Sequence, residues 1–238
     1  AFGIFINRGG PVPSVHSFGA SNLGWLFLIF LGVVMLLAFG LFFYRMALLR
    51  SSGSLESALS REAAFLVNNL LFLGVAFVTL WGVVFPIISE LVLDTTITVG
   101  EPFYNRVNGP IILILLFLMA IGPLLPWRHA TWGSVRRAIL TPGLITLGIT
   151  AVVAALGVDK PVVLIGVAVS TLVAISVLQE WVRGTHARHR ATREAYPVAF
   201  LQLIASNRPR YGGYVVHLAI VMLAFGIIGS TFYNIERD

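Results

Sequence analysis

The sequence predicts an all-α, polytopic membrane protein, built as a bundle of about six transmembrane helices with a few short interfacial helices. Hydrophobic residues make up 58% of its 238 residues and charged residues only 11%, whereas soluble domains carry about 25% charged residues. The apolar residues also gather in stretches long enough to cross a bilayer as helices. The sequence contains no cysteine, which excludes disulfides, thiolate metal ligands and a cysteine nucleophile.

Six stretches of about 17 to 25 mainly apolar residues account for most of the chain. Because no repeat or soluble domain separates them, we treat residues 1–238 as a single transmembrane domain. We expect the third and fourth, which are short, to cross with little tilt or to continue into flanking residues. The Asp159-Lys160-Pro161 turn predicts a tight outer hairpin between the fourth and fifth. The predicted spans are 23–44, 64–85, 110–126, 142–158, 161–182 and 213–233.

Basic residues are distributed unequally between the two sets of loops that six spans create. One set holds 12 of the 16 Lys and Arg residues, and the other holds Arg8, Arg106, Lys160 and Arg237. The positive-inside rule places the first set in the cytoplasm and both chain ends on the outer side. Membrane topology therefore accounts for the formal charge of +6, and nucleic acid is not an expected partner. The first set comprises Arg45, Arg50, Arg61, Arg128, Arg136, Arg137, Arg183, Arg188, Arg190, Arg193, Arg208 and Arg210.

The connecting segments have helical or surface character. Residues 51–62 contain apolar positions at helical spacing, which predicts a short helix on the inner membrane surface. In the inner loop 183–210, Pro197 opens a second such helix, with its apolar residues on one face. The outer segment 94–108 is polar, and its residues 95–99 favour an extended conformation. The apolar face of the second helix comprises Tyr196, Phe200, Leu203 and Ile204.

His217 lies inside the last apolar stretch, where an ionisable group is costly and usually functional. It follows the start of that stretch at Tyr211 by about six residues, or ~9 Å along a helix axis, so we expect it in the inner half of the membrane. The Gly212-Gly213 pair before it, and Gly226 and Gly229 after it, remove side-chain bulk where a helix or a flat cofactor could approach. Both a hydrogen bond between helices and ligation of a metal or haem fit this position. A proton relay is disfavoured because no acidic residue or lysine accompanies His217 at mid-membrane.

The remaining polar candidates have simpler interpretations. His16 precedes the first span, so it is either a histidine at the level of the lipid headgroups or a ligand for a cofactor delivered from outside. His129, His186 and His189 lie in arginine-rich inner loops, where contact with lipid phosphates explains them. Adjacent amides at Asn68 and Asn69 point in different directions from one helix, so at least one should face the bundle or a polar loop. Glu62 fits the dipole of a helix N-terminus.

Several strings together resemble CcmF, the membrane haem lyase subunit of cytochrome c maturation. Their order and spacing fit that family over nearly the whole chain. The strings are Ser14-Val-His16-Ser-Phe18, Ser60-Arg-Glu-Ala-Ala-Phe-Leu-Val-Asn68-Asn69, Val99-Gly-Glu-Pro-Phe-Tyr-Asn-Arg-Val107, Gly122-Pro-Leu-Leu-Pro-Trp-Arg128 and Tyr211-Gly-Gly-Tyr-Val-Val-His217.

The resemblance implies an enzyme, the cytochrome c haem lyase, in the bacterial inner membrane. It would take haem from a CcmE-like chaperone and attach it to the CxxCH motif of apocytochrome c, assisted by CcmH/CcmI-like subunits that reduce and present the apocytochrome. By the same resemblance, His16 would be one ligand of the delivered haem, which is the transient substrate. His217 would be one axial ligand of a separate haem b held in the membrane.

The resemblance also implies parts that this sequence does not contain. The tryptophan-rich WWD segment, the histidine before it and the upstream ligand of the haem b pair should lie elsewhere, as should a later outer domain. We therefore expect the chain to be a central fragment or one product of a split gene. It would supply half of each ligand pair, and the remaining parts of the same protein would be partners.

Two other classes of function stay open. A haem transporter or channel component would need discontinuous helices or a polar-lined path. In this sequence the prolines Pro123, Pro126, Pro142 and Pro161 are expected near the ends of spans rather than at mid-membrane. A non-catalytic assembly scaffold would use its histidines only for packing and partner contacts, and it would show no haem spectrum.

Overall fold

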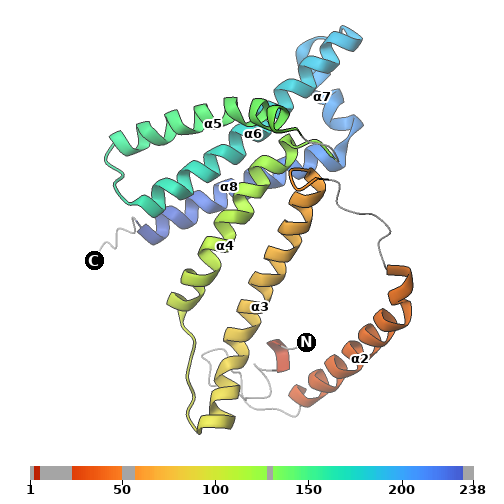
Figure 1. Ribbon diagram of the computed structural model, residues 1–238, viewed down its shortest axis with the longest axis vertical. Helices are drawn as coiled ribbons and strands as arrows, with labels where there is room; N and C mark the ends of the chain where they lie inside the picture. Colours follow the sequence, from red (N-terminus) through yellow and green to blue (C-terminus); the bar gives the residue numbers. More distant parts are fainter. Residues whose placement is uncertain (1–2, 6–22, 50–56, 128–130, 233–238) are drawn as a thin grey trace. The chain divides into compact units, whose positions relative to one another are not determined.

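The computed structural model describes residues 3–5, 23–49, 57–127 and 131–232 (Figure 1). Within these ranges the chain is helical and contains no strand, which confirms the predicted all-α class. The main elements are α2 (Leu23–Leu49), α3 (Arg61–Leu93), α4 (Glu101–Ile121), the 3-10 turn η1 (Gly122–Leu124), α5 (Trp132–Ala155), α6 (Pro161–Thr192), α7 (Tyr196–Ser206) and α8 (Arg208–Phe232).

Six of these helices are long and apolar enough to cross a membrane, which confirms the predicted number of spans. All six helices extend past the predicted bounds at one end or both, because an α-helix continues through polar residues as long as its backbone hydrogen bonds are satisfied. The clearest correction is α4, which begins at Glu101 and so takes in part of the expected polar outer segment. No strand forms at 95–99, a part of the chain that the structure describes.

Proline positions also differ from the prediction. The side chain of Thr131 accepts a hydrogen bond from the backbone N–H of Ser134, and this cap starts α5 ten residues before Pro142. Pro142 therefore lies inside a continuous helix rather than near its end. Hydropathy marks where the apolar run begins, whereas the cap decides where the helix begins. Pro86 and Pro110 likewise lie inside α3 and α4.

The chain divides into two compact units, which we describe separately. The first comprises residues 1–54 and 76–105, and the second comprises 55–75 and 106–238. In the first unit, the hydroxyl of Ser89 accepts a hydrogen bond from the backbone N–H of Ile97 at 2.9 Å, which ties the segment after α3 back onto that helix. Tyr104 lies so close to Gly82 that a Cβ there would overlap its ring.

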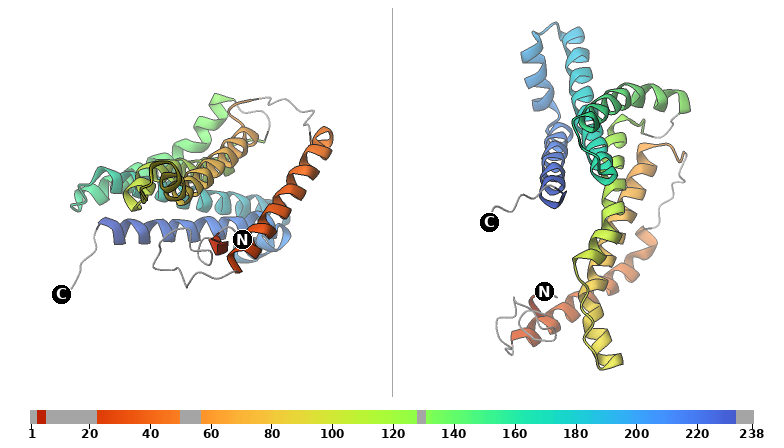
Figure 2. Two further views of the ribbon diagram at one scale, coloured as in Figure 1. Left: turned by 90° about the horizontal axis from the view of Figure 1, so that it is seen from below. Right: turned by 90° about the vertical axis from the view of Figure 1, so that its left-hand side faces the viewer.

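The second unit is organised around α6, which contacts α5, α7 and α8. Its best-buried residues form two clusters along α6, one around Val173 with Ala120 and Val221, the other around Val177 with Tyr211 and Tyr214. Figure 2 shows α7 folding back along the end of α6 before the chain enters α8. The predicted helix after Pro197 is thus confirmed as α7, and Leu203 and Ile204 of its apolar face pack towards the second cluster.

Gly184 is a position where α6 packs closely against both α7 and α8. A Cβ at this position would lie 2.8 Å from both Leu203 Cδ2 and Tyr211 Oη. We expect Gly184→Leu to destabilise the complete protein by about 1–3 kcal/mol through overpacking, measured as a lower midpoint of thermal unfolding in detergent. Gly148→Leu on α5, where a Cβ meets nothing within 4 Å, is the control. Equal midpoints for the two variants would contradict close packing at Gly184.

Candidate ligand cavity around His217

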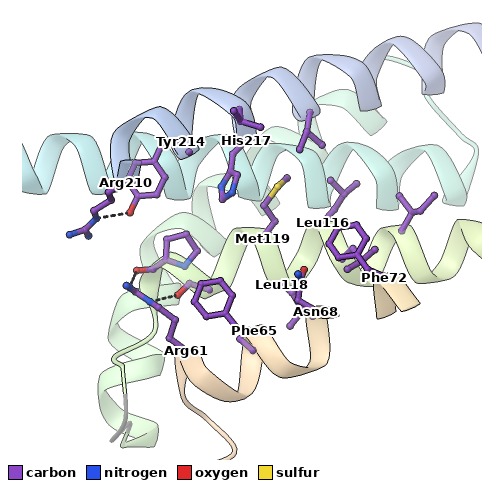
Figure 3. Close-up of a pocket in the computed structure, with 18 residues that line it drawn as sticks. Arg61, Phe65, Asn68, Phe72, Leu116, Leu118, Met119, Arg210, Tyr214 and His217 are labelled. Atoms are coloured by element: carbon purple, nitrogen blue, oxygen red, sulfur yellow. Dashed lines mark hydrogen bonds between the residues drawn. The ribbon is translucent and has the colours of Figure 1, made fainter. Parts of the chain in front are cut away.

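Three segments of the second unit line one half-open apolar cavity of about 580 Å³ (Figure 3). This volume falls in the range of about 300–1,000 Å³ that is usual for ligand pockets. The walls come from the first turns of α3, the second half of α4 with η1, and the first half of α8. The polar side chains among the lining residues are Arg61, Asn68, Arg210, Tyr214 and His217.

Arg61 holds one corner of the cavity together. Its backbone N–H donates to the carbonyl of Pro126 at 3.0 Å. Its guanidinium donates from Nε to the carbonyl of Gly122 at 3.1 Å and from Nη2 to that of Pro123 at 2.5 Å. These bonds add side-chain donors at the carbonyls of η1, of which that of Gly122 also accepts from the backbone N–H of Leu125 at 3.2 Å. Arg61 thereby fixes the start of α3 against the end of α4.

Two of the strings noted in the sequence therefore touch each other, and a third faces the same cavity. Phe65, in the string that starts at Ser60, packs edge-on against Trp127, in the string that starts at Gly122, with ring centroids 6.2 Å apart. The string that starts at Tyr211 lies in the first turns of α8 and contributes Tyr214 and His217 to the lining. Segments about 60 and about 150 residues apart in sequence thus build one site.

His217 projects from α8 into the cavity, as Figure 3 shows. Its Nδ1 atom is buried and makes no hydrogen bond with any described residue. An unsatisfied buried polar atom costs about 1–3 kcal/mol, so native structures usually supply a partner. None of the described helices provides the interhelical hydrogen bond that was one interpretation of this histidine.

The depth of His217 follows from where α8 begins. The helix starts at Arg208, earlier than the predicted span at residue 213, so His217 lies nine residues, or ~13.5 Å, from that end. The end that carries Arg208 and Arg210 is nevertheless the nearer one. Gly213, one turn before His217, also lines the cavity, and a Cβ there would meet nothing within 4 Å. The glycine leaves open space directly beside the imidazole.

The cavity has one polar end, at the start of α8. The guanidinium of Arg210 forms an ion pair with Glu180 at 2.6 Å and donates from Nε to the hydroxyl of Tyr214 at 3.1 Å. That hydroxyl in turn donates to Glu180 at 3.3 Å. The charge of Arg210 is thus balanced by α6, and the network sets the position of Tyr214 one turn from His217.

The paired amides behave as expected. Asn68 lines the cavity from α3, whereas its neighbour Asn69 is exposed. One amide therefore faces the bundle, as adjacent positions on a helix require. Glu62 lies in the first turn of α3, where a negative charge complements the helix dipole.

Two of the other histidines have structural partners at the turn between α6 and α7. His186 Nδ1 lies 3.0 Å from the hydroxyl of Tyr196, and His189 Nδ1 lies 2.6 Å from the carbonyl of Glu194. Arg188 donates a hydrogen bond to the Glu194 carboxylate at 2.8 Å, which holds the pKa of Glu194 below its usual value. No cluster of three or more metal-binding side chains occurs among the described residues.

Two predicted positions fall outside the part of the chain that the structure describes. They are His16, the expected ligand of delivered haem, and His129. Half of the expected surface helix within 51–62 lies outside it as well, and in the described half residues 57–60 form a turn before α3 begins at Arg61, so the prediction of a helix is wrong there. Arg61 is the residue that sequence reasoning missed. From the sequence, Arg61 was counted only among the basic residues of the inner loops, and its contact with η1 was not predicted. The signal that could have indicated a role for Arg61 is its place in the same family string as Asn68.

The fold and the cavity define a class: a multi-pass membrane protein whose helices line an apolar cavity, with one imidazole whose buried Nδ1 has no hydrogen-bond partner among the described residues. Among curated proteins, the chain is similar to cytochrome c-type biogenesis protein CcmF of Haemophilus influenzae, with 28% identity over 99% of the chain. It is 27% identical to CycK of Bradyrhizobium diazoefficiens over 98% of the chain, and 33% identical to Ccl1 of Rhodobacter capsulatus over 70%. The chain belongs to the CcmF family of cytochrome c-type biogenesis proteins.

The chain covers only part of these relatives, namely 36% of the CcmF protein, 35% of CycK and 25% of Ccl1. All three relatives are named as cytochrome c-type biogenesis proteins. No family model matches the chain, and no solved structure matches it.

Proposed function

We propose that this chain forms the haem b-binding part of a cytochrome c haem lyase, with His217 as one axial ligand. The observation that carries the proposal is the buried Nδ1 of His217, which has no partner among the described residues and lies on the wall of an apolar cavity of about 580 Å³. Family membership supplies the context, because the similar proteins are named for cytochrome c biogenesis.

The residues present fit such a group. A porphyrin is flat and mainly apolar, and the cavity walls are apolar side chains such as Phe72, Leu116 and Met119. Imidazole is a common axial ligand of haem iron, and His217 offers one without a competing hydrogen bond among the described residues. When bound, haem b supplies one-electron redox chemistry. The chain's own contribution is to hold the imidazole, line its surroundings with apolar side chains and leave space at Gly213.

A complete site needs more than this cavity. His217 is the one imidazole among its lining residues, so the second axial ligand of a bis-histidine site would come from another part of the protein. We propose that the delivered haem occupies a separate outer site to which His16 contributes. There the lyase would add the thiols of the CxxCH motif across the haem vinyl groups. A CcmE-like chaperone and CcmH/CcmI-like subunits would be the partners.

The structure bears on one competing function. A transporter or channel component would be expected to break its helices at mid-membrane, yet α5 continues through Pro142 and α3 through Pro86. At the polar end of the cavity, the charge of Arg210 is balanced by Glu180. Both observations favour a fixed binding site over a conducting path, and flux of labelled haem into liposomes without apocytochrome would contradict this preference.

The proposal is tested by the absorption spectrum of the complete protein that contains this chain. We expect a low-spin b-type spectrum after purification, with haem that acid acetone extracts because it is not covalently bound. Haem is quantified as its pyridine adduct and compared with protein concentration. A scaffold whose histidines serve only in packing would carry no haem, and such a preparation, confirmed as folded, would refute the proposal.

A further inference from the structure

The cavity holds two arginines, and they differ in how their charge is balanced. Arg210 pairs with the carboxylate of Glu180 at 2.6 Å. Arg61 contacts two carbonyl oxygens and, within the described part of the chain, no carboxylate. It uses two of the five N–H groups of a guanidinium in these bonds. Among the residues that the structure describes, three donors and the positive charge of Arg61 therefore have no partner at the polar end of the cavity.

We propose that Arg61 is the subsite for an anionic group of the cavity's ligand. On the proposed function, on which this inference rests, that group is a propionate of haem b. The ligand would therefore lie with its acidic edge towards Arg61 and its apolar edge towards Phe72. Figure 3 shows Arg61, Arg210 and Tyr214 gathered at one end of the cavity, with Phe72 and Leu116 at the other and His217 between.

The geometry around Arg61 supports a fixed anion site rather than a mobile surface charge. Its two carbonyl contacts come from Gly122 and Pro123, both in η1, and orient the plane of the guanidinium. Because the fork is already held in place, little further rotamer entropy is lost when an anion binds. A hydrogen bond between two charged groups in a partly buried site is also stronger than one between neutral groups.

The test compares two probes, haem and its dimethyl ester, which lacks the propionate charges. Each is titrated into the complete protein depleted of haem, and the dissociation constants are obtained from the absorption change. We expect haem to bind about 10–100-fold more tightly than the ester, as a charge-assisted hydrogen bond suggests. In Arg61→Gln the ratio should fall towards one, because the affinity for haem falls more than the affinity for the ester. Ester binding that is retained also shows that the variant is folded.

Three further variants make the result specific. Arg61→Lys keeps the charge and should keep part of the preference for haem over the ester. If Arg61→Gln binds neither probe, the test rests on Arg61→Lys, and a preference in that variant equal to that of the unaltered protein would refute the guanidinium subsite. Arg210→Gln should change the ratio less than Arg61→Gln, since Glu180 already balances Arg210. Arg137→Gln, exposed on α5 and outside the cavity lining, should leave the ratio unchanged.

The outcomes separate the two proposals. If the unaltered protein binds neither probe, the proposed haem site fails, and this inference fails with it. If both probes bind but Arg61→Gln keeps the full ratio, the haem site stands and the Arg61 subsite is refuted. A loss of discrimination in Arg210→Gln alone would move the subsite to Arg210 and also overturn the assignment.

Discussion

Replacing His217 with alanine in the complete protein is expected to remove most of its haem b. Changes in groups that merely support a metal ligand already cost about 10–100-fold in metal affinity, so loss of the ligand itself should lower haem content at least about tenfold. The substitution leaves the described hydrogen bonds intact, because His217 Nδ1 takes part in none of them. The measurement is haem per protein from the pyridine adduct, together with the low-spin spectrum.

His186→Ala is the matched control for this prediction. His186 contacts Tyr196 at the α6–α7 turn and does not line the cavity around His217, so haem content should stay unchanged. His217→Gly provides a second control, since added imidazole can occupy the space of the lost side chain and should restore the low-spin spectrum. Full haem content in His217→Ala would show that another residue holds the iron.

Filling the cavity beside His217 should have an effect of similar size. Gly213 lines the cavity one turn before His217, and a Cβ at this position meets nothing within 4 Å. Gly213→Phe would place a ring in the ligand space without disturbing the helix, because Gly is the weaker helix former by roughly 0.5 kcal/mol. We therefore expect haem to be lost while the midpoint of thermal unfolding of the haem-free protein is unchanged or slightly raised.

The adjacent glycine provides the comparison. Gly212 is exposed and does not line the cavity, and a Cβ added to it would likewise meet nothing within 4 Å. Gly212→Phe adds the same side chain one residue away on the same helix, and it should retain haem. If the two variants bound haem equally, the ligand would not occupy the space between α3, α4 and α8. This result would count against the cavity even if His217 remained a ligand.

Sequence reasoning was most successful where the signal is local. The six spans follow from the length of apolar runs, and the inner hydrophobic face of α7 follows from helical spacing after Pro197. It was least successful at helix ends. Glu101 and Trp132 begin their helices well before the apolar run, because caps and backbone hydrogen bonds set a helix boundary and hydropathy does not report them.

The amino-acid sequence was sufficient to establish the number of spans, the family strings and the presence of His217 inside the last span. Packing in three dimensions was needed to bring Arg61 against η1, across 61 residues of sequence, and to leave Nδ1 of His217 facing a cavity instead of a neighbouring helix. The difference arises because hydropathy and helical period depend on residues close in sequence. Hydrogen bonds, charge pairing and cavities depend on which distant segments pack together.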